Sequence, residues 1–320
     1  MLELTVKETS GFLSAFAELI GGELQNGILK IPESKGKGYL RGFRLHNTIE
    51  MFISNYEFND SLFAKRFGNQ SSLKKVLFSF NNIFPDTDSS NKVSTVDLPS
   101  IQIFKGKLST ETLYPGKTKF RSIFIGIDSL QLKQYLGQNE ENEVFNTLIN
   151  NEHPILFEEI VLPKIQEVAL EIIESDIPDY LSDFFFKIKA EELICLTLKE
   201  LFKRENATVQ ALNEMDVQKI YQVRDRVLAE IHTPPVIKDL AELTGMSESK
   251  FKRLFKQIFG NSFFNYYQKF RMKEAARLLK ENKMTVSEVG YSLGFSNLSH
   301  FAKAFEQHIG MKPKTFQRNR

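Results

Sequence analysis

The stretch GYSLGFSNLSHFAKAFEQHIGMKP, residues 290–313, decides the fold of the C-terminal third of the chain. Two glycines stand four positions apart, apolar residues then recur at helical spacing, and the stretch closes on Gly310 and Pro313. Apolar residues at i, i+3, i+4 and i+7 mark one face of a helix, and glycine commonly ends a helix in a left-handed conformation. The stretch therefore predicts two short helices joined by a sharp turn.

The same pattern occurs earlier, so the C-terminal third contains an internal repeat. IKDLAELTG at 237–245 matches VSEVGYSLG at 286–294, 49 positions later. A second helix follows in each copy, and its predicted buried face has the spacing i, i+3, i+4, i+7, i+8. These residues are Phe251, Leu254, Phe255, Ile258 and Phe259 in the first copy, and Phe301, Ala304, Phe305, His308 and Ile309 in the second. The presence of two copies favours a duplicated helix-turn-helix over a purely structural helical bundle. The two predicted motifs span residues 237–256 and 286–306.

Small residues and glycines occur at corresponding positions in the two copies. A small side chain is needed where the two helices of a pair approach closely, and glycine suits the turn between them. The positions to which we assign such structural roles are Ala241, Gly245, Gly290, Gly294, Phe295, Phe305, Gly310 and Pro313. Thr285 and Glu288 have the spacing of a capping box, which predicts the start of a helix. A helix over 262–282, roughly 30 Å long, is predicted to join the copies.

Charge divides the chain into two parts. Lys and Arg outnumber Asp and Glu by 19 to 10 in residues 216–320, but are outnumbered by 23 to 30 in residues 1–215. A basic C-terminal third suggests a polyanionic partner. We find no apolar run long enough for a membrane span and no signal peptide, and the single Cys195 suits a reducing cytoplasm. Cys195 lies in an apolar helical run, so we expect it in the core.

The N-terminal part predicts an α+β domain in which strands come first. Segments 38–58, 74–80, 100–108 and 119–127 are rich in β-branched and aromatic residues, and NNIFPDTDSSN (81–91) is a turn signal between two of them. This spacing suggests a small sandwich or barrel, which we place at 1–130. Metal-binding barrels need clustered ligands, and His46 and His153 alone do not supply them.

Helices are expected after this β-rich part, at 131–205. We predict them at 158–176, where Pro163 kinks the helix or marks its start, and at 180–205. The second has an apolar face that is either domain core or a dimer seam. This face consists of Leu181, Phe184, Phe185, Ile188, Leu193 and Leu196. A polar linker at 206–216 then leads to the helical domain at 217–320.

The C-terminal third resembles the AraC/XylS family of bacterial transcription regulators. The resemblance covers about residues 217–319 and rests on the fixed points of the second copy and on YYQKFRMKEAARLL (266–279), with Arg271 and Ala275 in the expected places. It implies an all-α domain with two helix-turn-helix motifs joined by a linker helix, after a cupin-like β-domain. Lys312 departs from the usual Ser or Thr before the proline, and His300 replaces a residue that is commonly Tyr or Thr.

The resemblance also assigns residues to DNA. Exposed residues of the second helix of each copy would read bases in the major groove. They are Ser249, Lys250, Lys252 and Arg253 in the first copy, and Leu298, Ser299, His300 and Lys303 in the second. Lys256, Arg271 and Lys314 would contact phosphates, which position the protein without specifying sequence.

The function expected from the resemblance is transcription regulation, with double-stranded DNA and RNA polymerase as partners. We expect a cytoplasmic activator without cofactor or metal, controlled through its N-terminal domain by a small-molecule effector or by homodimerisation. Segments such as SIQIFKGKLSTETLYPGKTKFRSIFIGI (100–127) loosely resemble members that respond to iron-siderophore complexes. The alternatives are a ligand-free dimeric regulator and an enzyme fused to a DNA-binding module. The second is disfavoured because no reactive cysteine or Cys/His cluster is apparent.

Overall fold

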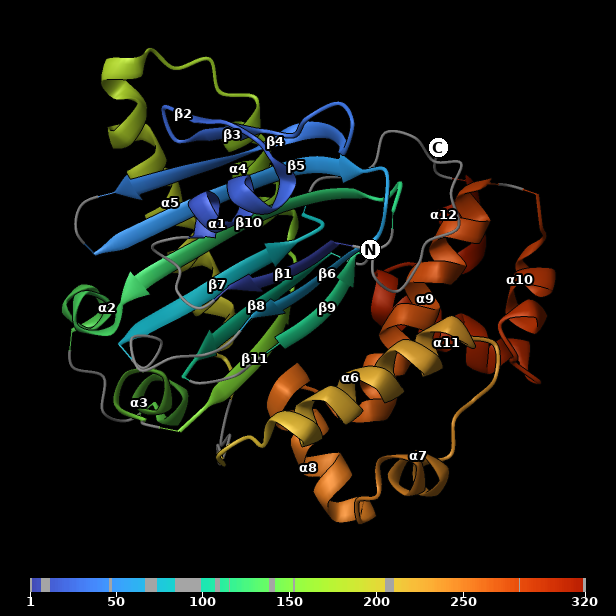
Figure 1. The fold of residues 1–320 in the computed structure, drawn as a ribbon. Coiled ribbons are helices and arrows are strands. Elements are labelled where there is room, and N and C mark those ends of the chain that lie inside the picture. Colours follow the sequence, from blue (N-terminus) through green and yellow to red (C-terminus); the bar gives the residue numbers. More distant parts are fainter. Residues whose placement is uncertain are drawn as a thin grey trace. The chain divides into compact units, whose positions relative to one another are not determined.

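A computed structural model of the chain describes most residues and divides the chain into two compact units, with the boundary at Glu214 (Figure 1). The boundary lies inside the segment that we predicted as a linker. The described residues are 2–6, 12–45, 48–66, 74–83, 99–106, 110–114, 116–137, 142–151, 153–204, 210–281 and 283–318. His46, most of the turn at 81–91, and parts of the linker therefore lie outside the described residues.

An antiparallel sheet of eight strands forms the centre of the N-terminal unit. Its order is β11-β8-β7-β10-β5-β4-β3-β2. The strands are β2 (Leu24–Gln25), β3 (Ile28–Lys30), β4 (Gly36–Leu45), β5 (Ile49–Phe58), β7 (Lys75–Asn81), β8 (Ser100–Lys105), β10 (Lys119–Asp128) and β11 (Ile155–Ile160). A three-stranded sheet contains β1 (Leu2–Val6), β6 (Leu62–Arg66) and β9 (Thr110–Tyr114). The predicted strands are therefore present, while a cupin-like barrel is not confirmed.

Both faces of the large sheet bury apolar side chains. Alternate residues of each strand point to opposite faces, so one strand contributes to two cores. The larger core packs strand residues such as Ile103 and Ile125 against helices that follow the sheet in sequence. These are α2 (Ser129–Leu136), α3 (Glu143–Asn150), α4 (Pro163–Ile173) and α5 (Asp179–Leu201). The smaller core, with Leu40 and Phe58, packs against α1 (Phe12–Ile20), a helix that the sequence patterns did not predict.

Two predictions for the helical region need correction. Of the two alternatives for the helix predicted at 158–176, the structure has the one in which Pro163 marks the start, and residues 158–160 are not helical because residues 155–160 pair with β8 as strand β11. Cys195 is exposed and not part of the core. The reason is that α5 buries the opposite side, with Leu193 and Ile194 in the core, and residue 195 follows on the solvent side.

The apolar face predicted on α5 is divided between core and solvent. Phe185 and Leu196 pack against the larger core and Leu193 is buried in it. In contrast, Phe184 is 65 % exposed and Ile188 is 45 % exposed. One apolar side of α5 packs against the core of its own domain, and the other apolar side is left exposed for a partner.

The C-terminal unit is entirely helical in its described residues. Its helices are α6 (Glu214–Ala229), α7 (Ile237–Thr244), α8 (Glu248–Phe259), α9 (Phe263–Glu281), α10 (Val286–Ser292), α11 (Leu298–Ile309) and α12 (Pro313–Arg318). The helix expected at 262–282 is α9, although Asn282 lies outside the described residues. In the part of the chain that the structure describes, no helix is both long and apolar enough to cross a membrane.

The capping box predicted at the start of α10 is confirmed. The Thr285 hydroxyl accepts from Glu288 N at 3.2 Å, and the Glu288 carboxylate accepts from Thr285 N at 2.7 Å. Thr285→Ala leaves one of the first amides of α10 without a partner, so we expect the free energy of unfolding to fall by about 1 kcal/mol. Denaturant titration measures this, with Ser287→Ala on the exposed side of α10 as the control. Equal stability of the two variants would contradict it.

Candidate nucleic-acid interface

The helix pair α7–α8 is joined by a tight turn that the local sequence specifies. Gly245 ends α7 with φ 65° and ψ 30°, a left-handed conformation. Ser247 then begins α8, and its side chain accepts from Lys250 N at 3.3 Å. The buried side of α8 inserts Phe255 and Phe259 into an aromatic cluster with Tyr266 of α9, with ring centroids 5.3 and 4.8 Å apart.

The pair α10–α11 repeats this arrangement with a closer helix contact. A Cβ placed on Gly290 of α10 would lie 2.7 Å from Leu298 Cδ2 and 3.1 Å from Phe301 Cδ1. A larger residue at that position would require the Leu298 and Phe301 side chains of α11 to shift. Asn297 caps α11, with its side chain accepting from Ser299 N at 2.8 Å. Gly310, with φ 87°, ends α11.

Helix α9 carries both pairs. At its N-terminal end Phe263 and Tyr266 pack on α8, while farther along Met272 and Leu279 are fully buried in the core of α10 and α11. The nineteen residues of α9 span about 28 Å, and the two pairs pack on successive parts of this one helix.

The side chains that we predicted to read bases lie mostly on the exposed sides of α8 and α11. On these two helices Ser249, Lys252, Arg253, Ser299, His300 and Lys303 are exposed. Lys250 is half-buried, and its Nζ lies 2.8 Å from a carboxylate oxygen of Asp216. Leu298 is also half-buried, since it packs against Gly290. The two helices thus present short polar and basic faces, with Lys250 and Leu298 already engaged within the unit.

The structure gives Arg271 a role inside the unit that differs from the predicted phosphate contact. The Arg271 side chain is 4 % exposed, and its Nε donates to the carbonyl oxygen of Leu293 at 2.8 Å. Its guanidinium also stacks on Phe295, 3.8 Å from the ring centroid. Burial lowers the pKa of this guanidinium, although arginine stays charged in proteins. Arg271 therefore fixes the end of α10 from within, whereas Lys256 and Lys314 are exposed as expected for phosphate contacts.

Two features of the site escaped the sequence patterns. The first is the Asp216–Lys250 pair, which joins residues far apart in sequence on α6 and α8. The second is the segment after α6, where the carbonyl of Ile231 accepts from the Tyr267 hydroxyl at 2.8 Å and His232 contacts the carbonyl of Ser292. No periodicity marks such contacts, because they depend on tertiary packing.

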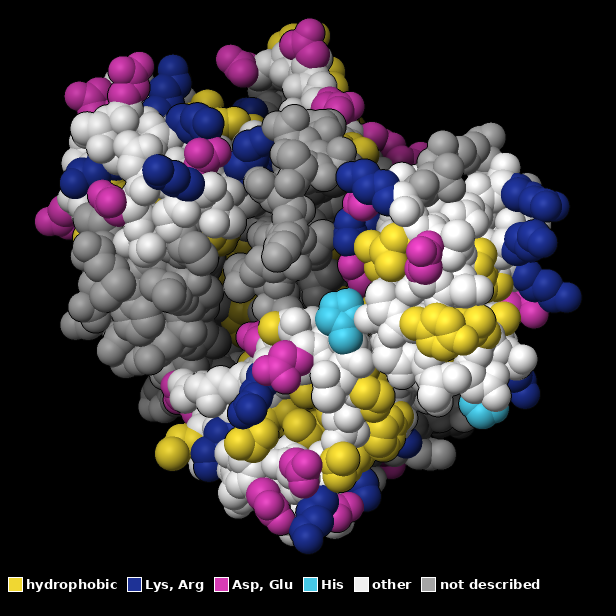
Figure 2. All heavy atoms as spheres, turned by 90° about the vertical axis from the view of Figure 1, so that its right-hand side faces the viewer, with side chains coloured by type: hydrophobic (Ala, Val, Ile, Leu, Met, Phe, Trp, Pro, Cys, Tyr) yellow, Lys and Arg dark blue, Asp and Glu magenta, His cyan; other side chains and the backbone are white. Residues whose placement is uncertain are grey.

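Charge on the surface is mixed. Figure 2 shows one face of the molecule, on which Lys and Arg side chains lie among acidic and hydrophobic ones. Ion pairs along helices contribute to this mixture, for example Lys252 with Glu248 at 2.9 Å. Among the described residues, no group of His, Cys, Asp and Glu side chains has the arrangement of a metal site.

These helices define a class, the helix-turn-helix DNA-binding domain. A family model described as a helix-turn-helix domain matches residues 240–319. The matched residues lie within 217–319, the region whose sequence resembles the AraC/XylS regulators.

Individual relatives are similar to this chain over part of their length. HTH-type transcriptional regulator GlxA of Rhizobium meliloti is 30% identical over 96 residues, which cover 30% of this chain and 30% of that protein. Regulatory protein PchR of Pseudomonas aeruginosa is 31% identical over 124 residues, 38% of this chain and 42% of that protein. The matches thus span less than half of these relatives. Both relatives are named as regulators.

Solved structures also include similar domains. A probable AraC family transcriptional regulator from Rhodopseudomonas palustris is 33% identical in sequence. The match covers 32% of this chain and 98% of that chain, with a TM-score of 0.30.

Proposed function

We propose that the chain is a sequence-specific transcription regulator that reads two successive major grooves with α8 and α11. The observation that carries this proposal is the pair of helix-turn-helix arrangements fixed on one helix. The length of α9, about 28 Å, is comparable to one turn of B-DNA, about 34 Å. One chain would then contact two segments on the same side of the duplex.

Roles follow from side-chain chemistry. Arg253 and Lys252 would donate hydrogen bonds to the guanine edge. Ser299 and His300, which have shorter side chains, would contact base edges from closer to the helix. Lys256 and Lys314 would contact phosphates. Ser249, Lys250, Leu298 and Lys303 complete the proposed reading faces. Lys250 would have to leave Asp216 or bind DNA while paired with it. The α8 face is the more basic, so it would supply more of the affinity.

We expect Arg253→Ala in the full chain to weaken binding to a selected genomic site by about 1–3 kcal/mol and to relax base preference there. Arg253 is exposed on α8, where its side chain can reach a base edge. Gel shifts on the site and its single-base variants measure this. Arg226→Ala, which removes an exposed arginine of α6, is the control.

Two outcomes would count against the proposal at different levels. Unchanged affinity and base preference for Arg253→Ala would remove this residue from the reading set. If the wild-type chain had no salt-dependent affinity for any genomic fragment, the DNA-binding function itself would fail, because phosphate contacts make such affinity fall steeply with salt.

Regulation is proposed to act through the N-terminal unit. Three parts of the proposal rest on the family resemblance. They are activation by recruitment of RNA polymerase, a cytoplasmic location, and a response to an effector such as an iron-siderophore complex. Dimerisation has support in the exposed apolar residues of α5. Tyr180, Leu181, Phe184 and Ile188 are all exposed and recur at helical spacing, as a seam between two copies requires. A ligand-free dimeric regulator is therefore the second candidate.

A further inference from the structure

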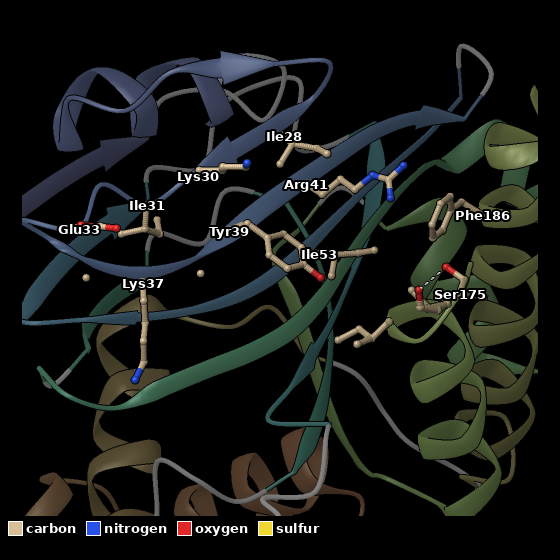
Figure 3. A pocket seen from close by; sticks show the side chains of 14 residues that line it. Ile28, Lys30, Ile31, Glu33, Lys37, Tyr39, Arg41, Ile53, Ser175 and Phe186 are labelled. Carbon is tan, nitrogen blue, oxygen red and sulfur yellow. Dashed lines mark hydrogen bonds between the residues drawn. The ribbon is translucent and has the colours of Figure 1, made fainter. Parts of the chain in front are cut away.

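A cavity of about 520 Å³ lies within the N-terminal unit, between one face of the large sheet and the region where α4 ends and α5 begins (Figure 3). Strands β3, β4 and β5 form its floor, and residues such as Ile172, Ser175 and Phe186 form its wall. This volume falls in the range of small-molecule sites, about 300–1,000 Å³.

Strand register brings three side chains together on the floor. Arg41 on β4 is paired with Ile28 on β3 and with Ile53 on β5. Directly paired residues of neighbouring strands point to the same face of a sheet. Tyr39, two positions before Arg41, therefore lies on that face too, as Figure 3 shows. The floor thus combines the apolar Ile28 and Ile53 with the Arg41 guanidinium, and Lys30, which is paired with Tyr39, lies on the same face.

The lining carries more positive than negative charge. Lys30, Lys37 and Arg41 line the cavity, against Glu33 as its one acidic side chain. Lys37 is paired with Glu57, with Nζ 3.3 Å from a carboxylate oxygen. Among the described residues, Lys30 and Arg41 pair with no carboxylate. With Lys37 paired to Glu57, the lining keeps Lys30 and Arg41 against Glu33, an excess of one positive charge.

The Arg41 guanidinium is held in place from two sides. It stacks on Phe43 and Phe186, with Cζ 4.6 and 5.1 Å from the ring centroids, and Nη2 donates to the buried Ser182 Oγ at 3.3 Å. These contacts fix the plane of the guanidinium and use one of its five N–H donors. A planar fork of this kind suits a carboxylate, which it binds through two parallel hydrogen bonds.

We infer that this cavity binds a small organic anion, a carboxylate carried by an apolar body. Arg41 anchors the carboxylate, Lys30 adds a second positive charge, and Ile28, Ile53 and Phe186 surround the apolar part. A cationic ligand would be repelled, and an inorganic anion would leave the apolar walls uncovered. The inference rests on the effector control proposed above and specifies the chemistry of the effector.

The test uses the full chain without DNA and isothermal titration calorimetry. Two carboxylates with different bodies, 2-naphthoate and decanoate, are compared with their neutral counterparts 2-naphthamide and decanol. At least one carboxylate is expected to bind about tenfold or more tightly than its counterpart, since a charge-assisted hydrogen-bond pair is lost in the neutral compound. Arg41→Gln is expected to remove this preference. Arg44→Gln, on the opposite, exposed side of β4, is expected to keep it.

The inference is overturned if neither carboxylate binds, if the neutral compounds bind equally well, or if Arg41→Gln retains the preference. Thermal unfolding shows whether Arg41→Gln is folded. If it is not, Lys30→Gln decides, with binding expected to weaken about threefold and an unchanged affinity counting against the inference. Gel shifts are run separately, so that failure of carboxylate binding with intact DNA binding rejects this cavity alone, and the converse rejects the DNA-binding function alone.

Discussion

Gly294→Ala is expected to lower the free energy of unfolding of the C-terminal unit by about 3 kcal/mol or more. Gly294 has φ 78°, a conformation that costs an L-residue about 1–2 kcal/mol. In addition, a Cβ at this position would overlap the carbonyl oxygen of His232, which is backbone and cannot rotate away. The turn between α10 and α11 would have to open, and α11 would lose its position on α9.

Gly245→Ala is the matched control, because Gly245 occupies the corresponding place in the first copy. Its φ is 65°, so it has the same conformational cost, but the nearest atom to an added Cβ is Lys219 Nζ at 3.8 Å. We expect a loss of about 1 kcal/mol for this variant. Denaturant titration of both full-length variants, monitored together with gel shifts, separates the two effects. A similar decrease in the free energy of unfolding for both variants would show that the contact with His232 does not contribute to the effect of Gly294→Ala.

The difference between these glycines shows what the sequence could and could not predict. The repeat, the helix pairs and the need for glycine at 245 and 294 follow from apolar spacing and from backbone conformation, which are local properties. The contact of Gly294 with His232 is not local, because it depends on how the segment after α6 packs on the second pair. The sequence therefore predicted a similar turn in both copies but not their unequal tolerance.

The N-terminal unit shows the same limit. β-Branched and aromatic runs located the main strands, since strand formation responds to alternating burial. The second half of β11, residues 158–160, was read as the start of a helix because Ile160 and Val161 continue into the apolar pattern of α4, and periodicity alone does not separate a buried strand from a helix. The cavity at Arg41 depends on register between β3, β4 and β5. No pattern within one segment carries that information.

Arg271 shows that positive charge alone does not identify a DNA contact. The sequence predicted such a contact because Arg271 is a basic side chain at a family-typical position. If it touched phosphate, Arg271→Ala would reduce the salt dependence of DNA binding and leave stability unchanged. The structure leads to the opposite expectation. The variant would leave the Leu293 carbonyl without its donors and remove the stack on Phe295, so the free energy of unfolding should fall by about 3 kcal/mol.

Arg271→Lys and Lys314→Ala sharpen this test. Lysine keeps the positive charge but has no planar fork to reach Leu293 O with two nitrogens, so Arg271→Lys should also be destabilised. Lys314→Ala should instead keep wild-type stability and reduce the slope of log affinity against log salt by about 1. Denaturant titration and gel shifts at several salt concentrations measure both quantities. Wild-type stability of Arg271→Lys, with a smaller salt slope for Arg271→Ala, would return Arg271 to the DNA surface.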